Sequence, residues 1–375
     1  MTPEYPGETN AYYAATAANG SSAYPYLVGP TDRGAADTAN FGQGPVPLDP
    51  AAIPYTGPNV SVPRSNAVPA HSEHATLGQR SGGRRVATSD GETLDYGAEL
   101  RGAVDAASGR LTVPELWEGF PGRAFGGFLA AAVLVAASEQ TRQARPLSLF
   151  SRYYRPAPVG QPLALALAEE RRGRNVDTLT ARLSDGDRLL STFSVAFGCD
   201  GDAEFTAQAI PPVAPVVQPR PVWEHLEAMG IEAGALMRRL GYRAETEKLP
   251  AEELAAGWHM RAEWPAAACE DPAVHAAVAA MAIDAFVGPA TMRANERDLD
   301  GDWPVMMPSL DLNCWFYAPE AQRGCDWLTV RTSVPVSRAG YAVGRTQVWA
   351  GDRLTAEGMS QVALVAVPPG EGGNA

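Results

Sequence analysis

Two polar side chains interrupt strongly apolar segments of this chain, and each has the chemistry of a catalytic group. Asp284 lies in the run AAMAIDAFVG, where a solvated helix face is hard to find. Burial disfavours a charged carboxylate and raises its pKa, so Asp284 is a candidate general base. Gln361 interrupts the apolar stretch Met359 to Val367, where a buried amide requires hydrogen-bond partners.

Several other catalytic arrangements are absent from the sequence. It contains no GxSxG serine-hydrolase elbow, no GxxxxGK[ST] phosphate loop and no HExxH zinc motif. The four cysteines are scattered and form no CxxC pair, which argues against a disulfide framework and against a cysteine-based zinc site. We therefore expect chemistry that uses neither a metal ion nor another cofactor.

The charge balance excludes several classes of partner. The 375 residues include 30 Lys+Arg and 43 Asp+Glu, giving a formal charge of −13. Nucleic acids and anionic membranes bind clustered positive charge, so we expect neither as a partner. No secretory signal is visible in Met1 to Asn10, and the apolar stretch Phe128 to Ala137 is about half of the ~20 residues that a membrane span needs. Together with a single lysine, Lys248, this composition indicates a cytoplasmic bacterial protein.

The first 95 residues differ in composition from the rest of the chain. They are rich in Pro, Gly, Ala, Ser and Asn and contain no tryptophan. Such a segment cannot bury enough apolar surface to offset its ordering entropy, so we expect residues 1–95 to form an irregular arm. Its tyrosines leave two interpretations open, a solvated tail or an arm that binds the protein's own body or a protein partner.

From about Tyr96 onward the pattern is typical of an α+β protein. Ala124 to Gln140 and Asp271 to Phe286 are Ala-rich and apolar nearly all round, which predicts two buried helices. Asp271 and Pro272 suit the start of the second helix. Leu100 to Val113 suggests a strand and a turn. Further extended runs are predicted at 147–154, 163–169, 175–184, 188–197, 257–264, 309–317, 327–336, 341–350 and 354–367.

Short motifs recur in the same order in both halves, which predicts an internal duplication. Ser148-Leu149 begins one set of extended runs and Ser309-Leu310 begins the other. The sequence GDRL occurs at 186–189 and again at 351–354.

A buried helix followed by an antiparallel meander, present twice in one chain, resembles the type II acyl-CoA thioesterase family. The resemblance covers roughly Gly119 to Val367. In the first half it rests on Phe125-Gly126-Gly127, Pro146-Leu147-Ser148-Leu149, Arg155-Pro156 and Arg172-Gly173-Arg174. In the second half it rests on Ile283-Asp284-Ala285-Phe286, Ser309-Leu310-Asp311, Trp315-Phe316, Trp327-Leu328 and Ser360-Gln361.

This resemblance implies a double hotdog, in which each repeat is a long central helix wrapped by an antiparallel sheet. The expected domains are an N-terminal hotdog at 96–204, a linker at 205–235, a C-terminal hotdog at 236–368 and a tail at 369–375. The implied activity is hydrolysis of an acyl-CoA or a related acyl thioester, and a homo-oligomer is expected.

The resemblance also implies roles for individual residues. The family uses an Asp, a Ser or Thr, and a Gln from its second hotdog, and here those places are assigned to Asp284, Ser309 and Gln361. Asp311 is expected to orient its neighbours. The backbone N–H groups of Gly126 and Gly127 are candidates for binding the thioester oxygen. Arg172 and Arg174 are either contacts for a CoA phosphate or exposed turn residues.

Two alternatives compete with this interpretation. A hotdog hydratase needs a catalytic His near a carboxylate, and His275 follows Asp271 by one helical turn. We expect His275 instead to be a partly exposed surface residue and Asp271 to cap the helix. The other alternative is a catalytically degenerate hotdog that binds acyl groups or acts in an assembly through its N-terminal arm.

Overall fold

A computed structural model of the chain describes residues 94–201, 220–228, 234–245, 248–295 and 305–366. All of them belong to one compact unit, Ala75–Ala375. Apart from its last two residues, the predicted arm lies outside the described residues, as do the predicted tail and most of the predicted linker.

One long buried helix lies at the centre of each half, as the sequence predicts. These helices are α3 (Gly126–Ser138) and α7 (Pro272–Ala285). The Asp271 side chain accepts a hydrogen bond from the Ala273 N–H at 2.8 Å and caps α7. Within the described residues, the helical stretch Pro272–Ala294 is long and apolar enough to cross a membrane, yet 83% of an 18-residue window within it is buried inside the protein. It therefore belongs to the core.

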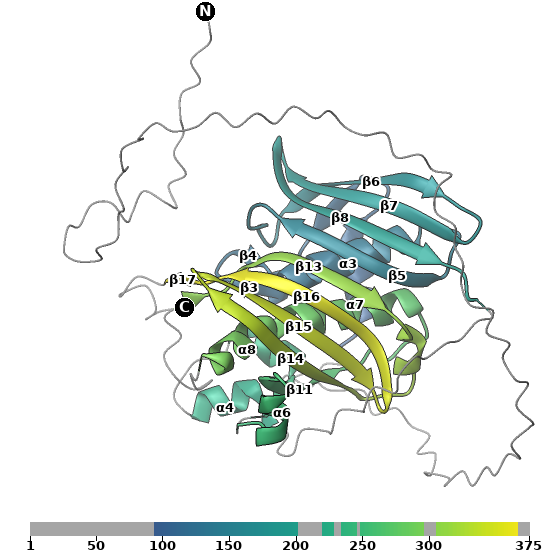
Figure 1. Cartoon of the computed structure of the whole chain (residues 1–375). Helices are drawn as coiled ribbons and strands as arrows, with labels where there is room; N and C mark the ends of the chain where they lie inside the picture. Colours follow the sequence, from purple (N-terminus) through teal and green to yellow (C-terminus); the bar gives the residue numbers. More distant parts are fainter. Residues whose placement is uncertain (1–93, 202–219, 229–233, 246–247, 296–304, 367–375) are drawn as a thin grey trace, which may run out of the picture. The chain divides into compact units, whose positions relative to one another are not determined.

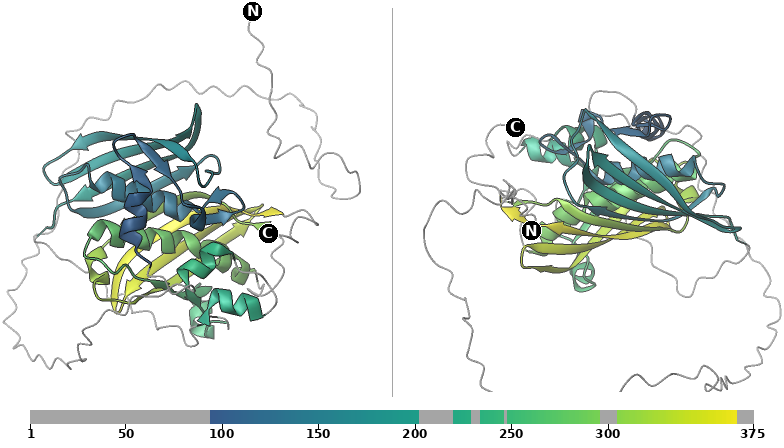
Figure 2. Two further views of the ribbon diagram at one scale, coloured as in Figure 1. Left: turned by 180° about the vertical axis from the view of Figure 1, so that it is seen from behind. Right: turned by 90° about the horizontal axis from the view of Figure 1, so that it is seen from above.

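An antiparallel sheet of 13 strands covers one side of both helices (Figures 1 and 2). The long strands of the first half are β5 (Arg145–Tyr153), β6 (Pro162–Arg172), β7 (Val176–Asp185) and β8 (Arg188–Gly198). Those of the second half are β13 (Ser309–Phe316), β14 (Trp327–Arg338), β15 (Tyr341–Ala350) and β16 (Arg353–Ala363). Their order in the sheet is β6-β7-β8-β5-β13-β16-β15-β14. The strands of the second half, β13 to β16, thus follow the same order as β5 to β8 when each half is read outward from the centre, as expected of two copies of one fold.

The two halves join through the sheet and through the helices. β5 pairs with β13, and the Ser151 hydroxyl donates to the Leu312 carbonyl across this boundary at 3.1 Å. α3 packs directly against α7. One continuous core therefore covers both repeats, and the predicted double hotdog is confirmed.

Shorter elements complete the fold. At the ends of the main sheet lie β1 (Val104–Asp105), β2 (Arg110–Thr112), β9 (Arg220–Pro221), β10 (Arg243–Ala244) and β11 (Met260–Pro265). Two small pairs are β3 (Glu118–Phe120) with β4 (Arg123–Ala124), and β12 (Val305–Met306) with β17 (Val365–Ala366). The remaining helices are α4 (Val222–Ala228), α5 (Ala235–Leu240), α6 (Ala251–Ala255), α8 (Val287–Ala294), and the 3-10 turns η1 (Glu115–Trp117) and η2 (Pro319–Gln322).

One expected element is different in the structure. The sequence predicted a strand and a turn from Leu100 onward. Leu100 instead lies in a helix, α2 (Tyr96–Gly102), and the short strands β1 and β2 follow it. Asp95 starts this helix, since its carboxylate accepts from the Ala98 N–H at 3.0 Å. Tyr96 and Leu100, four residues apart and both buried, form its inner face.

We predict that Gly358→Ala destabilises the fold. A Cβ at this position in β16 would lie 2.5 Å from the Asn313 carbonyl oxygen and 2.9 Å from Ile283 Cγ2. A paired strand and a buried helix cannot both move aside, so we expect a loss of about 1–3 kcal/mol in the free energy of unfolding, measured with denaturant. Gly102→Ala is the control, since nothing lies within 4 Å of that Cβ. Equal stability of the two variants would contradict the packing argument.

Candidate active site

The carboxyl of Asp284 lies where the end of α7 meets the beginning of α3. A Cβ added to Gly126 would lie 3.1 Å from Asp284 Oδ2, and one added to Gly127 would lie 3.0 Å from Met281 Cα. Only glycine permits so close an approach of the two helices. The Gly126-Gly127 pair is thus required by packing beside Asp284, and the structure brings these predicted residues together.

The first turn of α3 supplies hydrogen-bond donors to this place. Phe125 occupies the N-cap position and has no side-chain hydrogen bond to the helix. The first N–H groups of a helix have no partner within it. The Gly127 N–H instead favours the charged form of Asp284. The beginning of α3 therefore provides partial positive charge beside the carboxylate.

Ser309 contacts the same carboxyl from the sheet. Its Oγ donates to Asp284 Oδ1 at 2.7 Å. Ser309 is the first residue of β13, and an irregularity in pairing with β16 follows it, between Ser309 and Asp311. The predicted Asp284 and Ser309 are therefore adjacent in space.

Burial governs the acidity of Asp284, as the sequence predicts. The residue is only 6% exposed. The pKa of its carboxyl is raised to about 6, and desolvation is the largest cause. The nearby Asp311 carboxylate also raises this pKa, whereas hydrogen bonds from the Ser309 hydroxyl and the Gly127 N–H lower it. A base with this pKa is ionised at neutral pH and still accepts a proton readily.

Gln361 does not share this position. Its neighbour Ser360 is fully buried and lies on the face of β16 toward Asp284. Side chains alternate along a strand, and pairing with β15 is regular here, so the half-buried Gln361 side chain points to the opposite face of the sheet. The structure therefore places the predicted Gln361 amide on the face of β16 opposite to Asp284, whereas Ser360, which the sequence analysis did not select, lies on the face toward it.

Asp311 connects these groups without facing Asp284 itself. Its Oδ1 accepts from the Gln361 N–H at 3.0 Å, and its backbone carbonyl accepts from Ser360 Oγ at 2.7 Å. Its Oδ2 lies 3.4 Å from Arg152 of the first half. Asp311 thus orients its neighbours, as predicted.

Tyr153 is a second residue that the sequence analysis did not select. Its hydroxyl donates to the Gly126 carbonyl at 2.9 Å, which fixes the first residue of α3. Burial, followed by the charge of Asp284, raises the pKa of the phenol well above its usual value. Tyr153 therefore remains a neutral hydrogen-bond donor beside the carboxyl. The adjacent Tyr154, by contrast, is exposed.

The two predicted CoA-binding arginines lie elsewhere. Arg172 forms an ion pair with Glu169 and donates to the Gln140 carbonyl at 3.2 Å. Gln140 follows the end of α3, thirteen residues and roughly 20 Å from Gly127 along the helix axis. Arg174 is exposed, and its backbone carbonyl accepts from Gln143. A contact of either guanidinium with a CoA phosphate stays a prediction.

The histidine of the competing hydratase interpretation is also distant. His275 is fully buried rather than partly exposed, because it lies on the inner side of α7 and its Nε2 is 2.8 Å from the Cys269 carbonyl. It precedes Asp284 by nine residues, roughly 14 Å along α7. Asp271 caps the helix, as expected.

The duplication does not repeat the polar site in the first half. Ala137 is the second-last residue of α3, as Asp284 is of α7. Pro146 precedes the irregularity in β5 as Ser309 does in β13, and Val195 pairs with Leu149 as Ser360 pairs with Leu312. By this register, Ser148 matches Asp311 rather than the expected Ser309. The described residues therefore contain one such site per chain.

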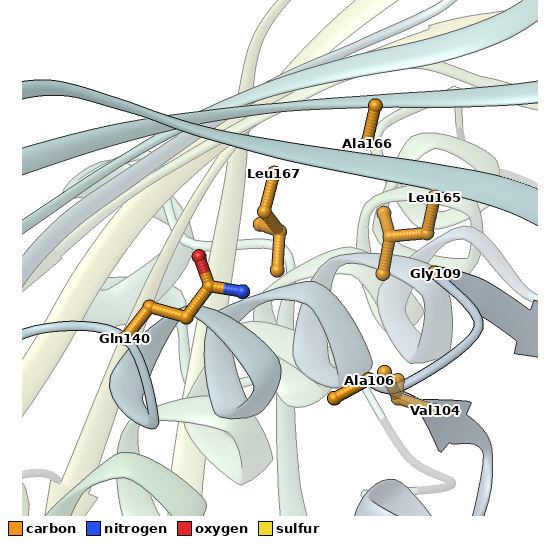
Figure 3. A pocket seen from close by; sticks show the side chains of 7 residues that line it. All are labelled: Val104, Ala106, Gly109, Gln140, Leu165, Ala166 and Leu167. Carbon is orange, nitrogen blue, oxygen red and sulfur yellow. The ribbon is translucent and has the colours of Figure 1, made fainter.

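A separate cavity of about 240 Å³ lies beyond the other end of α3, between the β1–β2 hairpin, β6 and Gln140 (Figure 3). In the second half, α8 packs against β14 and β15, the counterparts of β6 and β7. Leu165, Leu167 and Gln140 line the cavity, which Asp284 does not reach. Across the described ranges, no group of three His, Cys, Asp or Glu side chains is arranged to hold a metal ion.

Comparison with known proteins relates the chain to one enzyme family. The family model of the acyl-CoA thioesterase N-terminal domain matches residues 113–198. That of the acyl-CoA thioesterase C-terminal domain matches residues 212–365. Together they cover most of the described part of the chain. A search of curated protein sequences found no match.

Solved structures share the fold at low sequence identity. The tesB protein of Mycobacterium avium subsp. paratuberculosis is 18% identical, with a TM-score of 0.53 over 71% of this chain and 96% of that one. Acyl-CoA thioesterase II TesB2 of Mycobacterium marinum is 18% identical, with a TM-score of 0.54 over 72% and 98%. A hot dog protein of unknown function from Alicyclobacillus acidocaldarius is 19% identical, with a TM-score of 0.54 over 69% and 93%. At these identities the likeness concerns the fold alone.

We predict that Asp284→Asn stabilises the protein in a pH-dependent way. The folded-state pKa of about 6 exceeds the ordinary value of 3.8, so wild-type stability falls as the pH rises from about 4 to 6. Above pH 6 the variant avoids desolvating a charge, and we expect a gain of up to about 3 kcal/mol. Urea unfolding at pH 8 and pH 4.5 measures the gain and its loss.

Asp105→Asn is the control for this experiment. Asp105 is exposed, and hydrogen bonds from Ser108 lower its pKa, so removing its charge yields no gain at pH 8. A gain for Asp284→Asn that is the same at both pH values would contradict the assigned pKa.

Proposed function

Because the chain belongs to the acyl-CoA thioesterase family, we propose that it hydrolyses acyl-CoA thioesters at Asp284. The observation that carries this proposal is the Ser309–Asp284 hydrogen bond of 2.7 Å at the beginning of α3. This hydrogen bond fixes the orientation of a base of suitable pKa, and backbone N–H donors lie beside that base. Gly126, Tyr153 and Ser309 are only half-buried, so the carboxyl lies just beneath the surface.

Asp284 acts as general base on a water molecule. The water oxygen forms a bond to the thioester carbonyl carbon while one water proton moves to the Asp284 carboxylate. The tetrahedral intermediate then breaks its carbon–sulfur bond, and the thiolate leaves and takes up the proton. The products are a carboxylic acid and free CoA. Ser309 holds Asp284 Oδ1, which leaves the other carboxylate oxygen for the water.

The beginning of α3 stabilises the negative charge that develops on the carbonyl oxygen. Its first N–H groups have no partners within the helix: that of Gly127 acts on the Asp284 carboxylate, which leaves that of Gly126 for the thioester oxygen. Tyr153 holds the Gly126 carbonyl, which prevents this turn from rotating. The donors are therefore oriented before the substrate binds.

The assay for this function is release of free thiol from acyl-CoAs of short, long and aromatic acyl groups. We expect release by the wild type and a loss of at least about 100-fold in kcat for Asp284→Asn, because the amide cannot accept the proton. Asp271→Asn is the matched control: it caps the opposite end of α7, where asparagine also caps, so its rate should be unchanged.

Two outcomes would contradict the proposal. Near-normal turnover by Asp284→Asn would remove that residue as the base. Acyl-CoA binding by the wild type without thiol release would instead support a hotdog that binds acyl groups and does not hydrolyse them.

The pH dependence provides an independent prediction. With a base of pKa about 6, kcat/KM rises about tenfold per pH unit below 6 and is constant above it, because only the carboxylate accepts a proton. Ser309→Ala removes a hydrogen bond to the charged form, so the pKa rises and the midpoint moves to higher pH. Steady-state rates between pH 4.5 and 8.5 measure both effects. A midpoint that stays in place would show that Ser309 does not interact with the base.

A further inference from the structure

We propose that the open edge of β6 binds an extended segment of a protein partner, one apolar side chain of which enters the cavity beside Leu167. The binding mode is addition of a strand to the sheet, and it does not involve the site at Asp284. The second repeat has a strand of its own at the place where the first repeat has this opening.

The counterpart of β6 in the second repeat is β14, and the pairing of the strands defines which residues correspond. Leu183 of β7 and Val348 of β15 each precede the repeated sequence GDRL by three positions. Leu183 pairs with Leu165 of β6, and Val348 pairs with Val330 of β14. Leu165 therefore corresponds to Val330.

The edges of these two strands are covered to different extents. β11 pairs with β14 as far as Thr332, whose partner is Met260. β2 pairs with β6 only as far as Ala164, and one further hydrogen bond of 2.8 Å joins the Leu165 N–H to the Gly109 carbonyl. Gly109 has a φ of 62° and lies in the turn that connects β1 to β2, so the chain does not extend farther along β6.

Leu167, the counterpart of Thr332, lies where the cover of β6 has ended. N–H groups alternate between the two sides of a strand, so the N–H of Leu167 points to the same edge as that of Leu165. Among the described residues, no backbone carbonyl accepts from it there. Leu167 is only half-buried, whereas Thr332 and Met260 are both buried. The cavity of about 240 Å³ lies beside the Leu167 side chain (Figure 3).

Residues 166–168 lack the features that protect strand edges from pairing. Charged side chains and bulges are such features. Both are present farther along β6, in the charged run Glu169 to Arg172 and in the irregular pairing between Glu169 and Arg171. Residues 166–168, in contrast, are Ala-Leu-Ala and pair regularly with β7. The unprotected part of the edge and the cavity thus coincide.

β11 indicates the chemistry of the segment that fits this edge. It lies antiparallel to β14, and its Met260 side chain, opposite Thr332, is buried. α8 also packs against β14, but β11 is the element that pairs with the edge of that strand. A segment on β6 would likewise run antiparallel and place an unbranched apolar side chain opposite Leu167. A few paired residues and one filled cavity form a small contact, which suits a transient partner.

The probe is a fluorescent peptide with the sequence of residues 257–262, GWHMRA, which includes Met260 and its neighbours in β11. We expect saturable binding to the full chain, measured by fluorescence anisotropy. The control is the same peptide with Met260→Asp. We expect its affinity to be at least about tenfold lower, because its carboxylate would be desolvated in the cavity.

Leu167→Glu and Ala168→Glu in the full chain are a matched pair on opposite faces of β6. The first places a carboxylate beside the cavity, and we expect peptide affinity to fall at least about tenfold. The second places the same charge on the exposed outer face, and we expect affinity within about twofold of the wild type. Thermal unfolding checks that both variants fold. If Leu167→Glu does not fold, Leu167→Pro replaces it, since proline removes the N–H at the open edge without adding a charge.

Hydrogen exchange measures the pairing itself. We expect the peptide to slow exchange of the Leu167 N–H, because the added strand accepts a hydrogen bond from it. No binding of the Met260 peptide, equal affinity of the two peptides, or binding without this protection would overturn the proposal. A dimer of the full chain that the peptide dissociates would also overturn it, because a second copy would then occupy the edge.

Discussion

The close antiparallel contact between α3 and α7 is the constraint on which the site depends. It brings the end of one helix to the beginning of the other, so that Asp284 meets the first turn of α3. Two adjacent glycines permit this contact, because any side chain at Gly127 would lie 2.6 Å from the Phe125 ring and 3.0 Å from Met281 Cα. The Ala-rich surfaces of both helices also allow them to pack closely over their whole length.

Both repeats have the same arrangement of helix and strands, but the carboxyl and the serine hydroxyls of the site lie in the second repeat. Where Asp284, Ser309 and Ser360 lie in the second half, the first half has Ala137, Pro146 and Val195. The first half nevertheless contributes to the single site through Gly126, Gly127 and Tyr153. In the proposed hydrolysis each repeat therefore has its own role, one providing the base and the other the backbone donors.

The sequence was informative wherever burial followed from a long pattern. An apolar run that encircles a helix leaves no solvated face, so the burial of Asp284 and the direction of its pKa could be predicted. Which side chain of β16 faces Asp284 depended on the register of that strand, since a shift of one position reverses the face. Ser360 and Gln361 are adjacent and both polar. The signal that distinguishes them is Glu357, a charged residue four positions before Gln361 and therefore on its face.

The opposing helix ends explain why Asp284 suits both the fold and the proposed reaction. Its position at the end of α7 places it near the negative end of that helix dipole, and burial further disfavours its charge. The beginning of α3 presents the opposite dipole end, and the Ser309 hydroxyl adds a hydrogen bond. Burial alone would raise the pKa until the carboxyl stayed neutral. The donors alone would lower the pKa until the carboxylate was too weak a base to accept a proton. A pKa of about 6 results because both sets of groups act on one carboxyl.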